Sequence, residues 1–295
     1  MLRFQPTEAP LWDVNVPTSR KLAQICAWTD QYSRLSTDAK NFVQKGYCRA
    51  AVARFVLSAN LSEDTGLGDL DSTQEVLAAA GAVSSKPARE TKQLGAAMQL
   101  LADQYEEMSA AQPQHRLEAL TLTPDIICRV HRILMQDLIH NPGQHRLGEA
   151  YGGFATGVFF YQPSELIPSL ILTICDFYNQ SLCAIANTSD QVPRLYRLAA
   201  VLFMQFVTVH PFSDGNGRLA RLLASHVLRA VTPFPVTPHA DGTALTRTVY
   251  LDAIMAARSA DSKAFLSLSA PTDFTALLIQ SGWEGWRSCF DNLER

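Results

Sequence analysis

The stretch HPFSDGNGRLAR, residues 210–221, places a cluster of polar side chains between two helical segments. It holds a histidine, a carboxylate, two glycines, an asparagine and two arginines within twelve positions. The segment before it, residues 194–209, is too apolar for a surface helix, so it should cross the core and deliver His210 at its end. Helical periodicity resumes over residues 216–230. The polar residues therefore lie where two core helices meet, which is typical of a binding site.

The second half of this stretch is typical of a site for phosphate groups. Residues 214–217 form a tight loop before a helix, and the first turn of a helix presents unpaired N–H groups at the positive end of the dipole. Gly215 and Gly217 allow phosphate oxygens to approach the backbone closely. Arg218 and Arg221 are three positions apart and share one helix face, from which both can reach phosphates.

Asp214 and His210 supply the remaining chemistry. Magnesium binds one or two protein carboxylates together with phosphate oxygens, so Asp214 is the candidate metal ligand. His210, across the loop, is the candidate general base. In the alternative interpretation, Asp214 only caps the helix, His210 bonds a local carbonyl and the arginines are solvated. Five residue types that suit one ligand coincide here, and this coincidence favours the functional interpretation.

The composition limits the class of protein. The chain has 295 residues, is 47% hydrophobic and carries a net charge of −3, which fits a globular protein without the basic face that nucleic acids require. No apolar run reaches the length of a membrane span, and the N-terminus lacks the pattern of a signal peptide. The six scattered cysteines suggest buried thiols in a reducing compartment. We therefore expect a cytoplasmic protein with no nucleic-acid or membrane partner.

Helical patterns cover most of the chain. We expect helices over residues 45–60, 88–108, 165–178, 194–208, 216–230, 244–257, 261–268 and 273–293. A further helix should begin at Thr123-Pro124-Asp125, a capping residue followed by a first-turn proline. Residues 148–163, GEAYGGFATGVFFYQP, are rich in glycine and β-formers and predict a short surface hairpin. The sequence thus predicts a mostly α protein with one β flap.

At every defined position, residues 210–221 resemble the signature of the Fic (Fido) family, H-P-F-x-[DE]-G-N-[GK]-R-x-x-R. Weaker similarity extends over residues 122–270, through PGQHR before the hairpin, QPSELIPSLI after it, and RTVYLDAIMAARSAD. The resemblance implies a mainly α fold, a Fic-type helical bundle with a short β-hairpin flap. It also implies a protein adenylyltransferase (AMPylase), which uses ATP and Mg²⁺ to transfer AMP to a Ser, Thr or Tyr hydroxyl of a target protein.

The resemblance also divides the chain and assigns roles to its residues. The four parts are an N-terminal helical region (1–88), a connecting helix (89–121), the catalytic core (122–270) and a C-terminal helix (271–295). His210 would deprotonate the target hydroxyl, and Asp214 would hold Mg²⁺ on the α- and β-phosphates. The other implied nucleotide-site residues are Phe212 as the core anchor of the loop, Gly215, Asn216 and Gly217 as the phosphate cradle, Arg218 and Arg221 on the leaving diphosphate, and Tyr250 and Arg258 near the nucleoside.

The flap, near residues 150–161, would align the target backbone as an added strand. The flap residues implied in target docking are Tyr151, Gly152, Gly153, Phe154, Val158 and Tyr161. Arg258 stands where the family frequently has asparagine, so the resemblance leaves other nucleotide-like donors open.

An inhibitory element is also expected in the N-terminal region. Many Fic proteins carry [ST]-x-x-x-E-[GN] on a helix whose glutamate pairs with the second signature arginine and blocks productive ATP binding. The nearest match is ANLSED, residues 59–64, where Glu63 is the glutamate and Ala59 and Asp64 depart from the pattern. An acidic residue at a helix C-terminus is unfavourable by about 0.3–1 kcal/mol, and a buried Arg221 would offset this for Glu63. Alternatively, Glu63 is simply solvated where the helix ends.

Three functions stay open on the sequence. The first is an adenylyltransferase held back by Glu63, and self-modification is possible in that case. The second is a hydrolase that removes AMP from a modified protein through the same site, with Glu63 orienting water. The third is a catalytically silent module that binds a peptide through the hairpin, although such a module has no need of the base His210. The sequence leaves the target protein and the oligomeric state undetermined.

Overall fold

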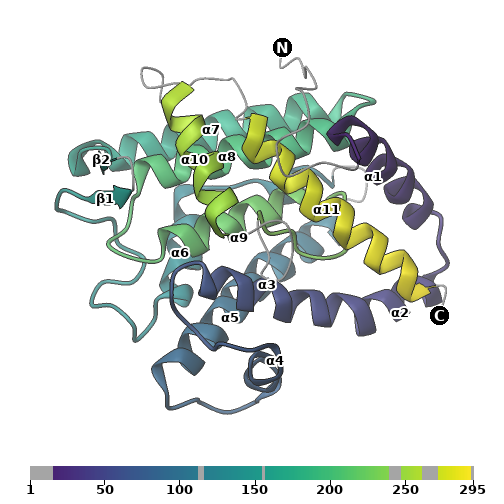
Figure 1. Cartoon of the computed structure of the whole chain (residues 1–295), viewed down its shortest axis with the longest axis horizontal. Coiled ribbons are helices and arrows are strands. Elements are labelled where there is room, and N and C mark those ends of the chain that lie inside the picture. The colour runs from purple at the N-terminus through teal and green to yellow at the C-terminus, as the bar shows by residue number, and fades with distance from the viewer. Residues whose placement is uncertain (1–15, 112–115, 155–156, 239–246, 261–271, 294–295) are drawn as a thin grey trace.

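The computed structural model describes residues 16–111, 116–154, 157–238, 247–260 and 272–293 (Figure 1). The helices, in chain order, are α1 (Thr18–Ser33), α2 (Thr37–Val43), α3 (Arg49–Leu61), α4 (Leu70–Ala78), α5 (Lys86–Ala111), α6 (Pro124–Leu134), α7 (Ile167–Ala186), α8 (Gln191–Val209), α9 (Asn216–Leu228), α10 (Arg247–Ala260) and α11 (Thr272–Leu293). The strands are β1 (Tyr151–Phe154) and β2 (Gly157–Phe160), and the π- and 3₁₀-helical turns are η1 (Gln44–Cys48), η3 (Glu118–Leu120) and η4 (Ser164–Leu166). The described chain is mainly α with a small antiparallel sheet, as the sequence predicts.

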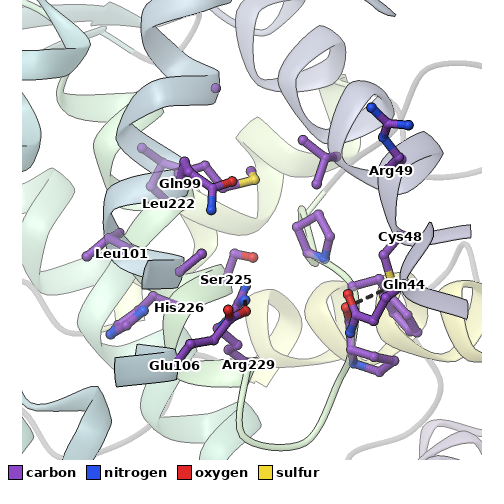
Figure 2. Close-up of a pocket in the computed structure, with 17 residues that line it drawn as sticks. Gln44, Cys48, Arg49, Gln99, Leu101, Glu106, Leu222, Ser225, His226 and Arg229 are labelled. Atoms are coloured by element: carbon purple, nitrogen blue, oxygen red, sulfur yellow. Dashed lines mark hydrogen bonds and ion pairs between the residues drawn. The ribbon is translucent and has the colours of Figure 1, made fainter. Parts of the chain in front are cut away.

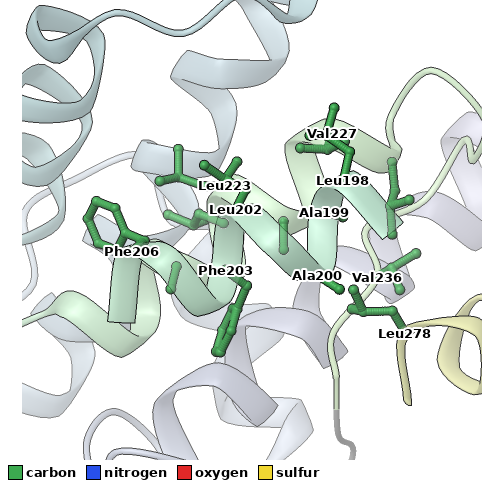
Figure 3. Close-up of a cluster of buried hydrophobic side chains, with 14 of the residues drawn as sticks. Leu198, Ala199, Ala200, Leu202, Phe203, Phe206, Leu223, Val227, Val236 and Leu278 are labelled. Atoms are coloured by element: carbon green, nitrogen blue, oxygen red, sulfur yellow. The ribbon is translucent and has the colours of Figure 1, made fainter. Parts of the chain in front are cut away.

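Helix α8 is the central helix of the bundle. Most of its residues are buried, which explains why its sequence is apolar on every face. Figure 3 shows Leu198 and Leu202 of α8 beside Leu223 and Val227 of α9 in one apolar cluster. On its other side, the ring of Phe203 stacks on the ring of Phe274 in α11. The core therefore fixes the direction of α8 and α9, and with it the place where the two helices meet.

The other helices surround this pair. α7 runs beside α8, and α11 crosses over the bundle and packs against α1 (Figure 1). The rings of Trp28 in α1 and Phe290 in α11 are stacked with centroids 6.3 Å apart. The hairpin β1–β2 lies at the end of the molecule opposite to α1 (Figure 1). This places the hairpin near the connection between α8 and α9 and far from the terminal helices.

The connection between α8 and α9 comprises residues 210–215. His210 ends α8 in the left-handed conformation, with φ 52° and ψ 59°, which is uncommon for a residue with a side chain. Gly215 precedes α9 with φ 77°, a conformation that glycine adopts at little steric cost. Two left-handed residues thus turn the chain sharply, so that His210 and the N-terminus of α9 flank one short loop.

The predicted elements agree with the structure in type and differ at several ends. The hairpin is present, with Tyr151 paired to Phe160 and Gly153 to Val158. Thr123 caps α6 through its side chain, as expected. α5 begins at Lys86, so that Pro87 lies in its first turn and does not precede the helix. The helix expected over 261–268 lies outside the described residues.

Helices α1 and α2 were not expected from the sequence. α1 buries few apolar residues, among them Leu22 and Ile25, so its own pattern is a weak signal. Helix α1 packs mainly on α11, where the ring of Trp28 meets those of Trp283 and Phe290. These partners lie about 260 positions away in the chain. Tertiary packing, and not local periodicity, therefore accounts for this helix.

The cysteines and the apolar helices bear on the expected class of protein. All six cysteines are free thiols, and burial raises the pKa of Cys48, Cys175 and Cys289 to about 12. Cys183 is exposed, contrary to expectation, since its position on α7 faces outward.

By length and composition alone, Ser164–Ala186 and Gln191–Val209 could each cross a membrane, so the expectation that no run is long enough was wrong. This is weak evidence for a membrane, because Gln191–Val209 is the core helix α8 and core helices commonly pass the same test.

The packing of α8 on α11 yields a test of the fold. The ring of Phe203 is fully buried and stacks on Phe274 with centroids 4.3 Å apart. Phe203→Ala should lower the free energy of unfolding by about 3–5 kcal/mol, because it removes a buried ring and leaves a cavity. Phe42→Ala, at a ring that is 62% exposed, should change it by less than about 0.5 kcal/mol. Denaturant titration measures both, and equal effects would contradict this account of the core.

Candidate functional site

The loop after His210 is held by its own side chains. The Asn216 side chain bonds the backbone of Phe212 twice: the Phe212 N–H donates to Oδ1 (3.0 Å), and Nδ2 donates to the Phe212 carbonyl (2.7 Å). Phe212 is fully buried, so it anchors the loop in the core. A Cβ at Gly215 would meet the side chains of Met135 and His131, so glycine is required here by space as well as by φ. The loop is therefore a rigid unit.

His131 of α6 holds this loop through contacts with Phe212 and Asp214. Its ring is fully buried and stacks on the Phe212 ring, with centroids 3.7 Å apart. The Gly143 N–H donates to Nδ1 (2.8 Å), so the neutral ring carries its proton on Nε2 and donates it to the Asp214 carbonyl (2.9 Å). Burial lowers the pKa of His131 to about 4, which keeps the ring neutral at pH 7. His131 thus fixes the backbone of Asp214.

Arg218 and Arg221 belong to the first two turns of α9, and both are almost completely buried. Four of their guanidinium nitrogens, Nε and Nη1 of Arg218 and Nε and Nη2 of Arg221, have no hydrogen-bond partner in the described part of the chain. Buried donors are rarely left unpaired, because this forfeits their hydration without replacing it. No side chain caps the N-terminus of α9, and Gly215 occupies the capping position. The first turn of α9 therefore offers a concentration of positive charge and donors that suits an anionic ligand.

Glu63, just beyond the end of α3, occupies part of this positive region. Its Oε1 accepts from Nη1 of Arg221 at 2.5 Å, across 158 positions of sequence, so the predicted pair is present. A Cβ at Gly217 would collide with the Glu63 carboxylate, which therefore lies against the first turn of α9. Burial disfavours the charge on Arg221, but Tyr250 and Glu63 outweigh this effect, and the pKa of Arg221 is raised.

Arg247, the first residue of α10, fixes the segment that carries Glu63. Its Nε donates to the Ser62 carbonyl at 3.0 Å, and its Nη2 lies 3.7 Å from a carboxylate oxygen of Asp64. Asp64 has φ 53°, a left-handed conformation that glycine and asparagine adopt most easily. This explains the preference for those two residues at the corresponding position of the inhibitory pattern, and Asp64 is accommodated here with Arg247 beside it.

Asp214 is the only carboxylate that the motif offers to a metal. Its side chain is 62% exposed and lies 3.9 Å from Nη2 of Arg218. One of its oxygens accepts from the Gly215 N–H at 2.6 Å. Within the described ranges, no group of three or more His, Cys, Asp or Glu residues could hold a metal ion alone. The donor set thus fits Mg²⁺ when phosphate oxygens and water supply the other ligands.

His210 lies across the loop from the arginines, in contact with the flap. The Tyr161 ring stacks on the imidazole, with centroids 3.9 Å apart and planes at 17°. The His210 carbonyl accepts from Nε of Arg146 at 2.7 Å. The imidazole is thus placed by residues on both sides of the hairpin, near the end of α9 where an anion would bind.

The flap has two different faces. Tyr151, Val158 and Phe160 are 72%, 59% and 71% exposed, whereas Phe159 packs edge-on against Tyr161 on the inner face. The ring of Tyr161, one of the residues that the resemblance implies in docking, covers His210, and its contact with a target stays a prediction. The structure describes the backbone of Gly152, Gly153 and Phe154 in β1, and the side chain of Phe154 lies outside the described residues.

Tyr250 is buried beneath Arg221, whose guanidinium lies 4.8 Å from the ring centroid. It thus belongs to the same group of residues as the motif, and its contact with adenosine stays a prediction. Arg258 lies in α10, and its side chain is outside the described residues.

A pocket of about 260 Å³ lies elsewhere, between η1, α3, α5 and α9 (Figure 2). Ser225 and His226 of α9 form one wall, and an ion pair between Glu106 and Arg229 (2.7 Å) lies beside them. Residues 210–221 do not line it. The pocket is therefore separate from the candidate site, although it touches α9, which carries Arg221, and α3, which precedes Glu63.

Comparison with known proteins identifies the family. A family model described as "Fic/DOC family" matches residues 121–228. A Fido domain-containing protein from Dictyostelium discoideum is 36% identical over 108 residues, which are 36% of this chain and 68% of that protein. The chain belongs to the Fic/Fido family. The resemblance seen in the sequence is thereby confirmed.

Other relatives bear on the fold alone or on a small part of the chain. A Fic domain-containing signaling protein from Bacteroides thetaiotaomicron has a TM-score of 0.73 at 21% identity and covers 93% of this chain and 97% of its own. Fic-1 from C. elegans (residues 134–508) has a TM-score of 0.69 at 20% identity, over 94% of this chain and 73% of its own. The ribonucleoside-diphosphate reductase small chain of Ostreid herpesvirus 1 is 30% identical over 122 residues. Our chain spans 21% of that protein's length, so its name says nothing about the activity here.

Three residues of this Fic site were missed in the sequence: His131, Arg146 and Arg247. His131 lies in the apolar stripe of α6, where a histidine is ordinarily read as part of the core, and only its contacts with the loop distinguish it. Arg146 and Arg247 lie in PGQHR and RTVYLDAIMAARSAD, two segments that carry the resemblance, but the resemblance implies no role for either residue. The role of Arg146 depends on the carbonyl groups of Val209 and His210, 63 and 64 positions away in the chain, which no local pattern reveals.

The neutral His131 predicts how stability depends on pH. Its pKa is about 4 in the folded protein and about 6.5 in the unfolded chain, so the unfolded chain binds more protons between these values. Stability from this residue is therefore complete above pH 6.5 and is lost as the pH falls toward 4. His131→Gln should reduce the loss of unfolding free energy between pH 7 and pH 5 by about 2 kcal/mol. Denaturant titration at both values checks this. The exposed His140→Gln is the control, and an equal change in it would contradict the assignment.

Proposed function

We propose that this protein is a protein adenylyltransferase, which transfers AMP from ATP to a Ser, Thr or Tyr hydroxyl of a target protein, and that Glu63 restrains it. The main support is the pair of buried arginines at the N-terminus of α9. Their unpartnered nitrogens call for an anion larger than one carboxylate, and Glu63 is the only anion that Arg221 meets in the described part of the chain. A triphosphate supplies several oxygens in this place.

The residues suit attack of a hydroxyl on the α-phosphorus. His210 takes the proton of the target hydroxyl, whose oxygen bonds to the α-phosphorus while the bond to the β-phosphate oxygen breaks. The diphosphate leaves with the negative charge, which Arg218 and Arg221 stabilise. Bound to Asp214 and phosphate oxygens, Mg²⁺ would neutralise charge on the phosphates. The protein mainly positions the reactants, so no covalent intermediate is required.

Glu63 opposes this reaction because it uses a donor that the nucleotide needs. A γ-phosphate and the Glu63 carboxylate compete for Nη1 of Arg221, and the carboxylate also lies over Gly217. With Glu63 in place, ATP is held in an unproductive pose.

The outer flap face, with Tyr151 and Phe160, offers the target a strand edge and exposed rings. A cytoplasmic location, and self-modification in the absence of a target, are further parts of the proposal.

Removal of Glu63 tests the restraint. Glu63→Gly should raise the incorporation of label from [α-³²P]ATP into protein by about tenfold or more, since a lost competitor worth about 1.4 kcal/mol changes occupancy tenfold. Label from [γ-³²P]ATP should not enter protein. Glu75→Gly, at an exposed glutamate of α4, is the matched control and should leave the rate unchanged. An unchanged rate in Glu63→Gly would refute the restraint, and release of AMP from a modified protein by the wild type would favour the hydrolase.

Removal of the base separates chemistry from binding. In the Glu63→Gly background, His210→Ala should lower transfer by about 100-fold or more, since a general base contributes about 10²–10⁴-fold. The affinity for ATP should stay within about twofold, because the imidazole acts on the target hydroxyl and not on the phosphates. Calorimetric titration with ATP and the labelling assay give both numbers. A loss of ATP affinity as large as the loss of transfer would mean that His210 is a nucleotide ligand.

A further inference from the structure

We propose that Arg146 is a positioning residue that couples the flap to His210, so that the flap orients the base as well as the target. The proposal rests on the proposed function only in naming His210 as the base. The physical link between flap and imidazole stands on contacts alone.

The guanidinium group of Arg146 joins the hairpin to the backbone of His210. Arg146 is 7% exposed, and its Nε donates to the His210 carbonyl at 2.7 Å. Its Nη1 donates to the carbonyl of Gly148, which precedes β1, at 2.5 Å, and its Nη2 donates to the carbonyl of Gln162, which follows β2. The same Nη2 also donates to the Val209 carbonyl at 3.3 Å. The side chain therefore bridges both ends of the hairpin and the end of α8.

The backbone of Arg146 adds a further bond, from its N–H to the Pro211 carbonyl at 2.9 Å. Three consecutive carbonyls, those of residues 209–211, thus accept from this one residue. They surround His210, whose left-handed backbone costs about 1 kcal/mol or more and persists only if its surroundings hold it. Arg146 supplies that support through charge-assisted hydrogen bonds.

The imidazole itself is held by the flap. Tyr161 stacks on it, and the Tyr161 N–H donates to the Ala150 carbonyl at 3.0 Å, which closes the base of the hairpin. The His210 carbonyl and ring are therefore both attached to the hairpin, the first through Arg146 and the second through Tyr161. A target that docks on the outer flap face binds to the same unit that sets the direction of the base.

The geometry of arginine is essential to this role. Its planar group carries donors on three nitrogens that point in different directions. A lysine keeps the charge but has one nitrogen, which cannot reach the His210, Gly148 and Gln162 carbonyls together. We call this set of hydrogen bonds, from Arg146 to the His210, Gly148 and Gln162 carbonyls, the joint. Arg146→Lys should loosen the joint while leaving the positive charge in place.

Hydrogen exchange and NMR test the joint without any need for activity. In Arg146→Lys, amide exchange should rise at least about tenfold in residues 148–154 and 157–162 and also in 207–212, whereas α9 should stay protected and ATP affinity should stay within about twofold. The His210 ring resonances, assigned with His210→Ala, should lose the upfield shift that the stacked Tyr161 ring imposes, as they should in Tyr161→Leu. Arg194→Lys, at an exposed ion pair on the first turn of α8, is the control and should change neither readout.

Several results would overturn the proposal. Faster exchange in the flap alone would show that Arg146 ties the hairpin down without acting on His210, and unchanged spectra would show that it does neither. Faster exchange throughout α9 with loss of ATP affinity would make it a general fold residue. If Arg146→Lys does not fold, Tyr161→Leu decides: an unchanged His210 resonance would exclude the link between flap and imidazole.

An activity measurement then connects the joint to the reaction. In the Glu63→Gly background, Arg146→Lys should lower the self-modification rate at saturating ATP by about tenfold, with KM for ATP unchanged. A raised KM at unchanged rate would contradict a positioning role. If Glu63→Gly itself shows no transfer, the proposed function fails, while the exchange and NMR results still decide the joint.

Discussion

Two guanidinium groups are buried at the amino end of α9, and the arrangement of the site follows from their charge. Removing such groups from water is costly, so each requires an anion or a full set of acceptors. The described chain supplies only part of this. Arg221 has the Glu63 carboxylate and the Tyr250 ring, and Arg218 has the Met135 sulfur and a contact of 3.9 Å with the exposed Asp214. Four guanidinium nitrogens stay unpartnered. In the proposed function, a polyphosphate meets this demand better than a carboxylate does, and it replaces the Glu63 carboxylate, whose side chain is 36% exposed.

Around these charges, the site combines a rigid part and an adjustable part. The loop 210–215 is rigid, because Asn216 bonds Phe212 twice and the neutral His131 holds the Asp214 carbonyl from a buried position. The adjustable part lies nearer the surface: the Glu63 carboxylate, whose side chain is 36% exposed and pairs with Arg221, and the flap, whose outer face is exposed. In the proposed joint, Arg146 carries the position of the flap to the rigid loop. A target and a nucleotide would thus act on the two sides of His210.

Much of this site could be predicted from the sequence, and the rest could not for identifiable reasons. The Fic signature predicted the fold family, the meeting point of two core helices and the anion site, because its residues are contiguous and their spacing has direct geometric meaning. The Glu63–Arg221 pair was predicted only through the family resemblance, since 158 positions separate the two residues. Arg146 and His131 act through hydrogen bonds to backbone carbonyls, which carry no sequence signal. Helix α1 was missed for a different reason: its packing partner α11 lies at the other end of the chain, so its own sequence shows little periodicity.

The claim that Glu63 and a nucleotide phosphate exchange at Arg221 is tested most directly by comparing ATP with ADP. Calorimetric titration of wild type and Glu63→Gln with each nucleotide, in Mg²⁺, gives the ratio of the two affinities in each protein. If the carboxylate occupies the place of the γ-phosphate, the preference for ATP over ADP should rise about tenfold or more in Glu63→Gln, since the charged competitor is removed and ADP has no group there. The same preference in both proteins would show that the Glu63 carboxylate and the phosphate do not share a site.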